Sequence, residues 1–307
     1  MEVISGSEDA LLFRLAATTW SVPVSAGYGR RIRFLVEDAS NGKLIGIFAL
    51  GDPVAGLRAR DSWIGWSTEQ RRARLSSVMD AYTCGAIAPY NMLLGGKVVV
   101  SMMGSKEVND VFDRKYRYRP SEFSGAEKHP RLVLITVTSA LGRSSLYNRV
   151  KLPGLVSLEN LGRRTGGWGY FRINNRLFDA MRQLLELDGH PYAFGNSWQA
   201  GRRGPNWRMR VIREAAKRSD VDVDVLNHGI HREVFAMPLA KRWKEYLNGQ
   251  GTRCAISLPA VSTMGRAAVN RWLIPRSTRR PEWCRWSDRD RAAMFDHIIA
   301  DQAGLLL

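Results

Sequence analysis

The sequence predicts an α/β protein with a mixed sheet flanked by helices, followed by a basic, mainly helical C-terminal region. In the first half, apolar runs of strand length alternate with segments of helical periodicity. The β-branched runs Ile32–Val36 and Ile45–Leu50 are joined by a turn sequence at Ser40–Lys43, which predicts a hairpin and makes part of the sheet antiparallel. In the second half most periodic segments are helical.

Each element follows from its local pattern. After the hairpin, strands are expected at Met79–Ala88 and Arg131–Thr138. Capping and periodicity predict helices in four further segments of the first half, namely Glu69–Val78, Leu93–Met103, Ser105–Tyr116 and Ser144–Val150. The second half is expected to hold one short strand, Val234–Met237, and the helices Arg176–Glu186, Asn206–Lys217, Val261–Leu273 and Ser287–Asp301.

Charge divides the chain unevenly. Residues 1–150 carry a net charge of +6 and residues 151–307 a net charge of +11. A glycine cluster near Asn160–Gly169 marks the boundary between the two regions. We therefore expect an α/β core over residues 1–160 and a basic region that contacts nucleic acid over residues 161–307.

Composition excludes several classes of protein. With 45% apolar and 24% charged residues, the 307-residue chain is expected to fold around a core. Its 46 Lys and Arg against 29 Asp and Glu give a net charge of +17, which favours a polyanionic partner, nucleic acid before an anionic membrane. The longest apolar runs, Val98–Met103 and Leu132–Val137, are far short of the roughly 20 residues that cross a bilayer.

The cysteines and the N-terminus indicate a reduced, cytoplasmic protein. Three widely spaced cysteines do not describe a disulfide framework, and they form no zinc-binding pattern. The acidic segment Met1–Asp9 lacks the basic region of a signal peptide. His228 and His231 lie three residues apart without a further ligand nearby in the sequence, so no metal site is expected.

Hydroxyl side chains gather at the end of a buried strand. Ligands bind at this edge in open α/β sheets. Thr138 ends the strand, and Ser144, Tyr147 and Arg149 follow within eleven residues. We expect a functional site here, centred on Thr138, Ser144 and Tyr147.

A second candidate site is the glycine-rich turn before the helix expected at Leu93–Met103. Asn91, Gly95, Gly96 and Lys97 there would hold a phosphate against the helix N-terminus. The segment is not a Walker A loop, and a tight turn without a ligand is the alternative.

Aromatic and basic residues alternate in several further segments, which is typical of nucleic-acid contacts. In the first, Asp61 would orient a ligand between two tryptophans; an aromatic edge packed on the core is the alternative. For the others the alternatives are a turn and a solvated basic face. The candidate nucleic-acid-binding residues are Trp63, Trp66, Arg149, Arg164, Trp168, Arg202, Arg203, Trp207 and Arg208.

Four segments together resemble the DruA-like family, which is associated with the Druantia anti-phage system and also occurs near mobile elements. They are Gly46–Pro53, Arg60–Trp66, Thr138–Arg149 and Leu161–Gly169, and the resemblance covers roughly residues 30–240. Its most specific part is Arg60–Trp66.

The same region resembles, more distantly, the GNAT N-acyltransferase fold in the order of its expected elements. That resemblance implies a glycine turn that cradles the pyrophosphate of an acyl-CoA. Of its motif only Gly96 is matched, because Asn91 and Leu94 stand at the other two positions. It also implies that Tyr147 protonates a leaving thiolate, and that Tyr147→Phe folds but loses activity.

Three functions remain open from the sequence. The first is a GNAT-like enzyme of a defence or mobile-element system that transfers an acyl group to DNA, with Asp61 or Asp80 as base. The second is a catalytically inactive DNA-binding component that works with other defence proteins. The third is a nuclease or a transposase-associated protein.

Overall fold

The computed structural model describes residues 1–20, 29–120, 125, 127–140, 142–170, 173–194, 207–251 and 254–304. The chain forms two compact units, the first made of Met1–Arg164 and Glu233–Leu307 and the second of Thr165–Arg232. The chain therefore returns from the second unit to the first. The sequence expectation differed, because it placed a single boundary at residue 160.

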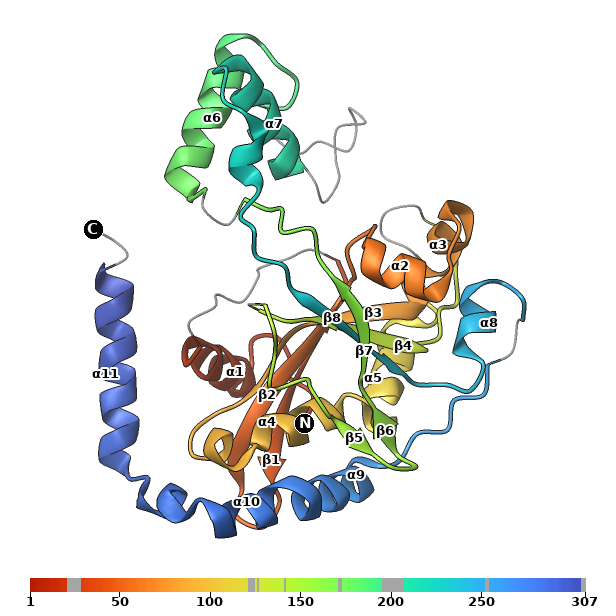
Figure 1. Ribbon diagram of the computed structural model, residues 1–307, viewed down its shortest axis with the longest axis vertical. Coiled ribbons are helices and arrows are strands. Elements are labelled where there is room, and N and C mark those ends of the chain that lie inside the picture. The colour runs from red at the N-terminus through yellow and green to blue at the C-terminus, as the bar shows by residue number, and fades with distance from the viewer. Residues whose placement is uncertain are drawn as a thin grey trace. The chain divides into compact units, whose positions relative to one another are not determined.

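The first unit is built on a six-stranded mixed sheet (Figure 1). Its strand order is β1-β2-β3-β4-β8-β7, and only β3 and β4 run parallel. The strands are β1 (Arg31–Asp38), β2 (Lys43–Gly51), β3 (Val78–Ala86), β4 (Leu134–Thr138), β7 (Glu159–Arg164) and β8 (Glu233–Pro238). The mixed α/β architecture expected from the sequence is confirmed.

The parallel pair at the centre of the sheet is short. β3 and β4 pair only from Val78 with Leu134 to Asp80 with Thr136. Beyond that point the register between β2 and β3 shifts, so that Tyr82 becomes an extra residue in β3. A bulge of this kind bends a strand and increases its twist. Beyond Asp80 and Thr136 the carboxyl ends of β3 and β4 therefore no longer pair with each other, although β3 stays paired with β2 and β4 with β8.

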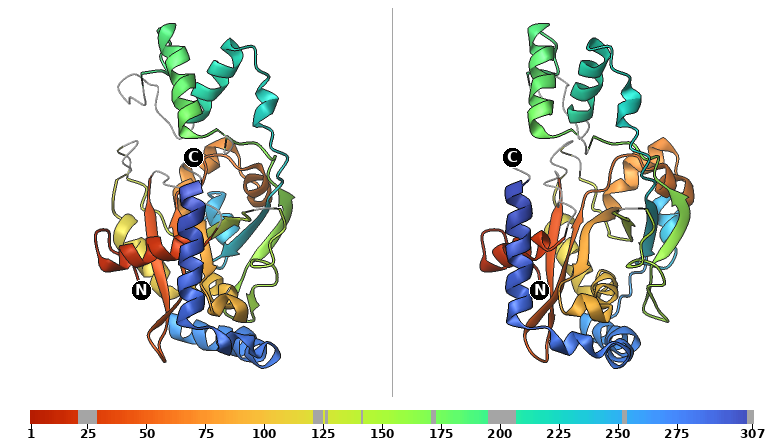
Figure 2. Two further views of the ribbon diagram at one scale, coloured as in Figure 1. Left: turned by 90° about the vertical axis from the view of Figure 1, so that its left-hand side faces the viewer. Right: turned by 60° about the vertical axis from the view of Figure 1, so that its left-hand side comes forward.

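Helices cover both faces of the sheet. On one face α4 (Gly95–Met102), α5 (Lys106–Tyr116) and α9 (Val261–Ala268) pack on the largest apolar cluster, and α9 lies alongside α4 (Figures 1 and 2). The segment Val269–Leu273 then continues into α10 (Ile274–Arg279) and, further on, α11 (Asp288–Gly304). On the other face lie α1 (Glu8–Thr18), α2 (Arg58–Ile64) and α8 (Trp243–Leu247), with α3 (Thr68–Arg74) against α8.

In the described part of the second unit, the α-helices are α6 (Asn175–Leu187) and α7 (Trp207–Arg218). Their apolar faces meet around Phe178, Leu185, Val211 and Ile212. Two backbone segments of the unit run antiparallel, joined by hydrogen bonds from Thr165 N to Arg232 O and from His228 N to Gly167 O, both 2.9 Å.

One expected helix is wrong. Residues Ser144–Val150 form turns, and the short β5 (Lys151–Leu152) and β6 (Val156–Ser157) follow. Arg149 has a φ of 60°, which a right-handed helix does not allow. Among the described residues, no helix combines the length and hydropathy needed to cross a bilayer.

Candidate ligand pocket

β3 and β4 separate after Asp80 and Thr136, and we call this separation the split. A polar contact between these two residues joins the strands at its base. The Thr136 hydroxyl donates a hydrogen bond of 2.8 Å to Oδ1 of Asp80. Thr136 is fully buried, and these are the last two residues of the parallel register. The split therefore carries a carboxylate at the point where the strands stop pairing.

Tyr147 lies in the apolar cluster beneath the sheet. Its ring centroid is 5.5 Å from that of Phe235 in β8, and the residue is 8% exposed. Burial, with smaller effects from Cys84 and Asp80, raises the pKa of the Tyr147 phenol above its ordinary value. The phenol therefore stays protonated at neutral pH.

The other hydroxyl residues of this segment bond to backbone or hold the turns. Ser144 Oγ accepts a hydrogen bond from Tyr147 N at 3.3 Å, and Ser144 N donates to Oε2 of Glu233 at 3.1 Å. Thr138 pairs with Val234 across the sheet. Tyr147 and Ser144 are thus neighbours through a turn, and not through the helix that the sequence predicted over Ser144–Val150.

Lys97 organises the segment that replaces the expected helix. Its ammonium donates to the carbonyl oxygens of Ser145 at 3.1 Å and Leu146 at 3.3 Å, and also to that of Asn148. These carbonyl groups point toward Lys97, so they are not free to bond along a helix axis. Desolvation, with a smaller effect from the charge of Arg149, lowers the pKa of Lys97.

The two glycines before Lys97 are closely packed against other parts of the chain. A Cβ on Gly95 would lie 2.6 Å from the carbonyl oxygen of Tyr90, and one on Gly96 would lie 2.5 Å from Cδ1 of Leu146. The space beside Gly96 is therefore filled by the chain itself. Asn91, which was grouped with these residues, is exposed.

A hollow of about 670 Å³ opens beside this turn. Its lining consists of Lys97, Arg143, Ser145, Asn148, Arg149, Arg271 and Trp272. The three arginines are exposed, and none forms an ion pair within the described part of the chain. The pocket thus brings together four cationic side chains and no acidic one.

The structure places Asp61 elsewhere, in an ion-pair network on α2. Arg60, which is fully buried, has Nη2 at 2.7 Å from Oδ1 of Asp61, and Arg71 Nη1 lies 3.2 Å from Oδ2. The adjacent tryptophans hold α8 in place. Trp63 stacks on Trp243 with centroids 4.7 Å apart, and Trp66 Nε1 donates to Leu247 O at 2.8 Å.

The candidate nucleic-acid residues of the second half also have packing roles. In the second unit Trp207 donates to Tyr192 O at 3.0 Å and meets Phe178 edge-on. Arg208 lies over the Phe178 ring, 4.2 Å from its centroid. Trp168 of this unit and Arg164 of the first are exposed, whereas Arg202 and Arg203 fall outside the described residues. Nucleic-acid binding by these residues stays a prediction.

Sequence reasoning missed Arg143, Arg271 and Trp272 as pocket residues. The local signal for Arg143 was its place among the hydroxyls after β4, but nothing near Arg271 points to Lys97. No three His, Cys, Asp or Glu side chains converge as metal ligands within the ranges that the structure describes.

The fold and the pocket define a mixed α/β protein in which a hollow lined by cationic side chains lies beside α4, the helix that follows β3. The chain belongs to the DruA family: the profile of that family, described as "Druantia protein DruA", matches residues 1–249. It is also 45% identical over 304 residues to the Druantia protein DruA of Escherichia coli (strain UMEA 4076-1), a match that covers 97% of this chain and 72% of that protein. The resemblance noted from the sequence is thereby confirmed. No solved structure matches the chain significantly.

Proposed function

We propose that this chain is a DNA-binding component of a Druantia anti-phage system, and that its cation-lined pocket holds phosphate groups of the DNA backbone. It would act in the cytoplasm together with other proteins of the system. Family membership supports the defence role. The pocket supports the binding role.

The observation that carries the proposal is the imbalance of charge around the pocket. Arg143, Arg149 and Arg271 surround Lys97, and the lining contains no carboxylate. Like charges held together repel, and here Arg149 already contributes to the lowered pKa of Lys97. A bound anion relieves that repulsion. Arginine forks and the lysine ammonium are the groups that proteins use to bind phosphate.

Two features favour nucleic acid over a small anion. The net charge of +17 attracts a polyanion over the whole surface. The three arginines are also exposed, so they can reach a backbone that lies across the mouth of the pocket. Trp272 is only 7% exposed and so forms the wall of the pocket, where it offers little ring surface for stacking with a base.

Fluorescence anisotropy with labelled DNA of both strand states tests the proposal. The triple variant Arg143→Ala, Arg149→Ala, Arg271→Ala should weaken binding and lower the log-log salt slope by about 3, one unit for each phosphate group that the variant no longer binds. The matched control Arg14→Ala, Arg72→Ala, Arg289→Ala removes the same charge from three exposed positions outside the pocket. Equal weakening by both triples, or no DNA binding at low salt, would refute a pocket-centred site.

The second candidate is the GNAT-like acyltransferase. The observation that favours it is the central parallel pair, which splits after Asp80 and Thr136 and has Tyr147 beneath it. The hairpin, strand, glycine turn, helix and strand also follow the order that suggested the resemblance. Against acyl-CoA binding, Leu146 fills the space at Gly96, and Lys97 already bonds three carbonyl groups.

Thermal stability distinguishes the two candidates. A ligand at 100 times its dissociation constant stabilises the protein by about 2.7 kcal/mol. Stabilisation by an acyl-CoA that persists in the pocket triple variant would favour the transferase. Stabilisation by short DNA alone, absent in that variant, is what the binding role predicts.

A further inference from the structure

Helix α7 carries a row of basic side chains on the face opposite its buried residues. Val211 and Ile212 are buried in the core of the second unit. Arg210, Arg213 and Lys217, which we call the α7 row, are exposed, and their spacing of three and four residues places them on one side of the helix. No ion pair joins any of them to another residue that the structure describes. The row therefore presents three positive charges to solvent.

The acidic side chains closest to the row in sequence are held by another arginine. Arg218 lies 3.2 Å from Oε2 of Glu214 and 2.7 Å from Oδ2 of Asp188, so its charge compensates both carboxylates. Residues 171–172 and 195–206, which belong to the second unit but lie outside the described ranges, contain no Asp or Glu. These segments therefore supply no acidic group that could neutralise the α7 row.

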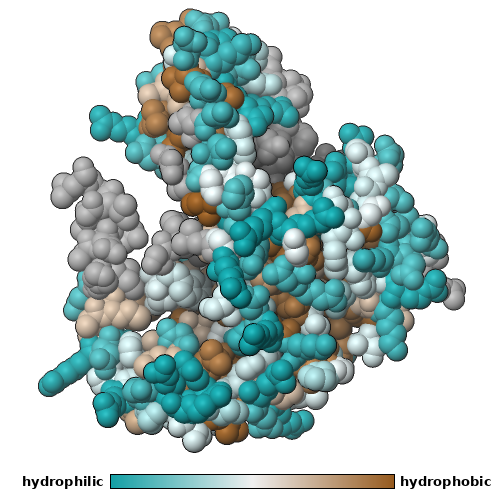
Figure 3. Space-filling view, viewed as in Figure 1, coloured by the Kyte–Doolittle hydropathy of each residue, from teal (hydrophilic) through white to brown (hydrophobic). Residues whose placement is uncertain are grey.

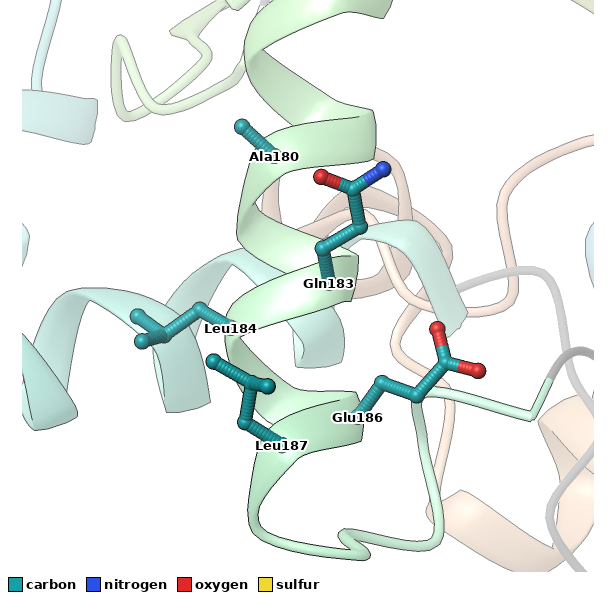
Figure 4. A pocket seen from close by; sticks show the side chains of 5 residues that line it. All are labelled: Ala180, Gln183, Leu184, Glu186 and Leu187. Atoms are coloured by element: carbon teal, nitrogen blue, oxygen red, sulfur yellow. The ribbon is translucent and has the colours of Figure 1, made fainter.

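Helix α6 presents a different surface. Brown, apolar side chains are visible over α6 in Figure 3. The hollow beside it is lined by Ala180, Gln183, Leu184, Glu186 and Leu187, so its lining contains one carboxylate and no cationic side chain (Figure 4). That carboxylate repels a polyanion, whereas the α7 row attracts one. Of these two surfaces, the α7 row is the one that fits a polyanionic partner.

We infer that the α7 row binds the phosphate backbone of duplex DNA. This inference rests on the proposed DNA-binding role, to which it adds a second contact surface and a strand state. From Arg210 to Lys217 the row spans about 10 Å, because each residue of an α-helix rises about 1.5 Å. Each strand of a duplex carries one phosphate group per about 3.4 Å of its axis. The row therefore has the length of about three phosphate groups.

Two features favour a duplex over a single strand. The helix holds its three cations along a line, which matches a stiff duplex better than a flexible strand, and the major groove of DNA admits an α-helix. Proteins that bind single strands also stack bases on aromatic side chains. The only aromatic residue of α7, Trp207, meets Phe178 edge-on and donates its indole N–H to Tyr192 O at 3.0 Å. Its contacts therefore lie within the second unit, and the row itself contains no ring on which a base could stack.

Fluorescence anisotropy with one labelled DNA sequence, as a duplex and as a single strand of equal length, tests the inference. The full chain with Arg210→Ala, Arg213→Ala and Lys217→Ala should bind the duplex about tenfold or more weakly at low salt, and its log-log salt slope should fall by about 3. Alanine has the highest helix propensity, so α7 should remain folded. The control triple variant described for the pocket removes the same charge from three exposed positions of the first unit, and it should weaken binding less.

A variant that keeps the charge separates a phosphate contact from a structural effect. Arg210→Lys with Arg213→Lys should bind the duplex within about threefold of wild type, because the release of counterions from DNA depends on the positive charge. A loss as large as that of the alanine variant would overturn the inference. Weakening by the alanine variant no greater than that of the control, or equal loss of duplex and single-strand affinity, would also overturn it.

Failure of this inference is distinguishable from failure of the proposed function. If wild type binds DNA and the pocket triple variant weakens that binding while the α7 variant matches the control, the α7 row is refuted and the role of the pocket stands. If wild type binds neither the duplex nor the single strand at low salt, the proposed function itself fails, and this inference fails with it.

Discussion

The hydroxyl of Thr136 donates to Oδ1 of Asp80 at 2.8 Å, across the last register position where β3 and β4 are neighbours in the sheet. The pair places a polar side-chain contact between two strands whose other paired residues are apolar. Thr136 therefore supplies a hydrogen-bond donor at the position where the two strands separate. We expect the contact to hold the base of the split together.

The substitution Thr136→Val tests this contact. Valine keeps the shape of threonine but removes the donor, and Thr136 is fully buried. Removing one partner of a buried hydrogen bond destabilises a protein by about 1–3 kcal/mol. Urea denaturation should show that destabilisation, whereas Thr136→Ser, which keeps a hydroxyl, should be destabilised less. Equal destabilisation in both variants would mean that packing, and not the hydrogen bond, is what matters at this site.

Elements set by local pattern were predictable from the sequence. The hairpin of β1 and β2 follows from two β-branched runs and a turn, and α5, α6 and α7 follow from apolar periodicity; all of these are confirmed. Their ends differ from the prediction by a few residues at most.

Elements set by distant contacts were not predictable. β7 and β8 are antiparallel neighbours in space but are separated in sequence by the whole second unit. The short α2 is held by the buried Arg60 and by Trp66, whose partners Val54 and Leu247 are not apparent from its seven residues. Ser144–Val150 was expected to form a helix, but Lys97, from another segment, attracts its carbonyl groups.

The pocket was predictable only in part for the same reason. Lys97 and Arg149 were identified from their own segments, one from a glycine turn and the other from the hydroxyl-rich strand end. Their proximity depends on the turn that Lys97 stabilises. Arg271 lies in the segment Val269–Leu273, which follows α9 and packs on α4, and no local pattern in the sequence indicates that contact.

The ion pair between Arg60 and Asp61 should be important for stability, whereas the ion pair between the more exposed Arg71 and Asp61 should not. Desolvation lowers the pKa of Arg60, and Asp61 is the main charge that opposes this effect. Asp61→Asn leaves a buried guanidinium without that charge, so unfolding measurements should show a destabilisation of about 3–5 kcal/mol. Arg71→Ala, which removes the more exposed partner of Asp61, should change stability by about 1 kcal/mol or less. Similar destabilisation in the two variants would contradict the assigned difference.

Tyr147→Phe separates the two candidate functions. Burial raises the pKa of the phenol and the ring packs on Phe235, so the ring itself should account for most of its contribution to the core. We expect a melting temperature close to that of wild type. In the DNA-binding role, phage plating efficiency in cells that carry the complete defence system should match wild type. Loss of protection by a folded variant would support Tyr147 as an acid and favour the transferase.

Gly96→Ala should destabilise the protein, and Leu146→Ala should relieve part of that effect. A Cβ on Gly96 would lie 2.5 Å from Cδ1 of Leu146, which is closer than atoms pack, so either the leucine or α4 must move. Removing the leucine side chain frees the space, so the double variant should be more stable than the sum of the two single effects predicts. Residues in contact show coupling free energies of about 0.5–3 kcal/mol in such cycles.

Gly46→Ala provides the comparison, because its Cβ would meet the backbone carbonyl of Gly85, a group that no side-chain substitution removes. Paired with the same Leu146→Ala change, Gly46→Ala should therefore give additive effects in urea denaturation. Additive effects for Gly96→Ala as well would mean that Leu146 is not the group that requires a glycine at the start of α4.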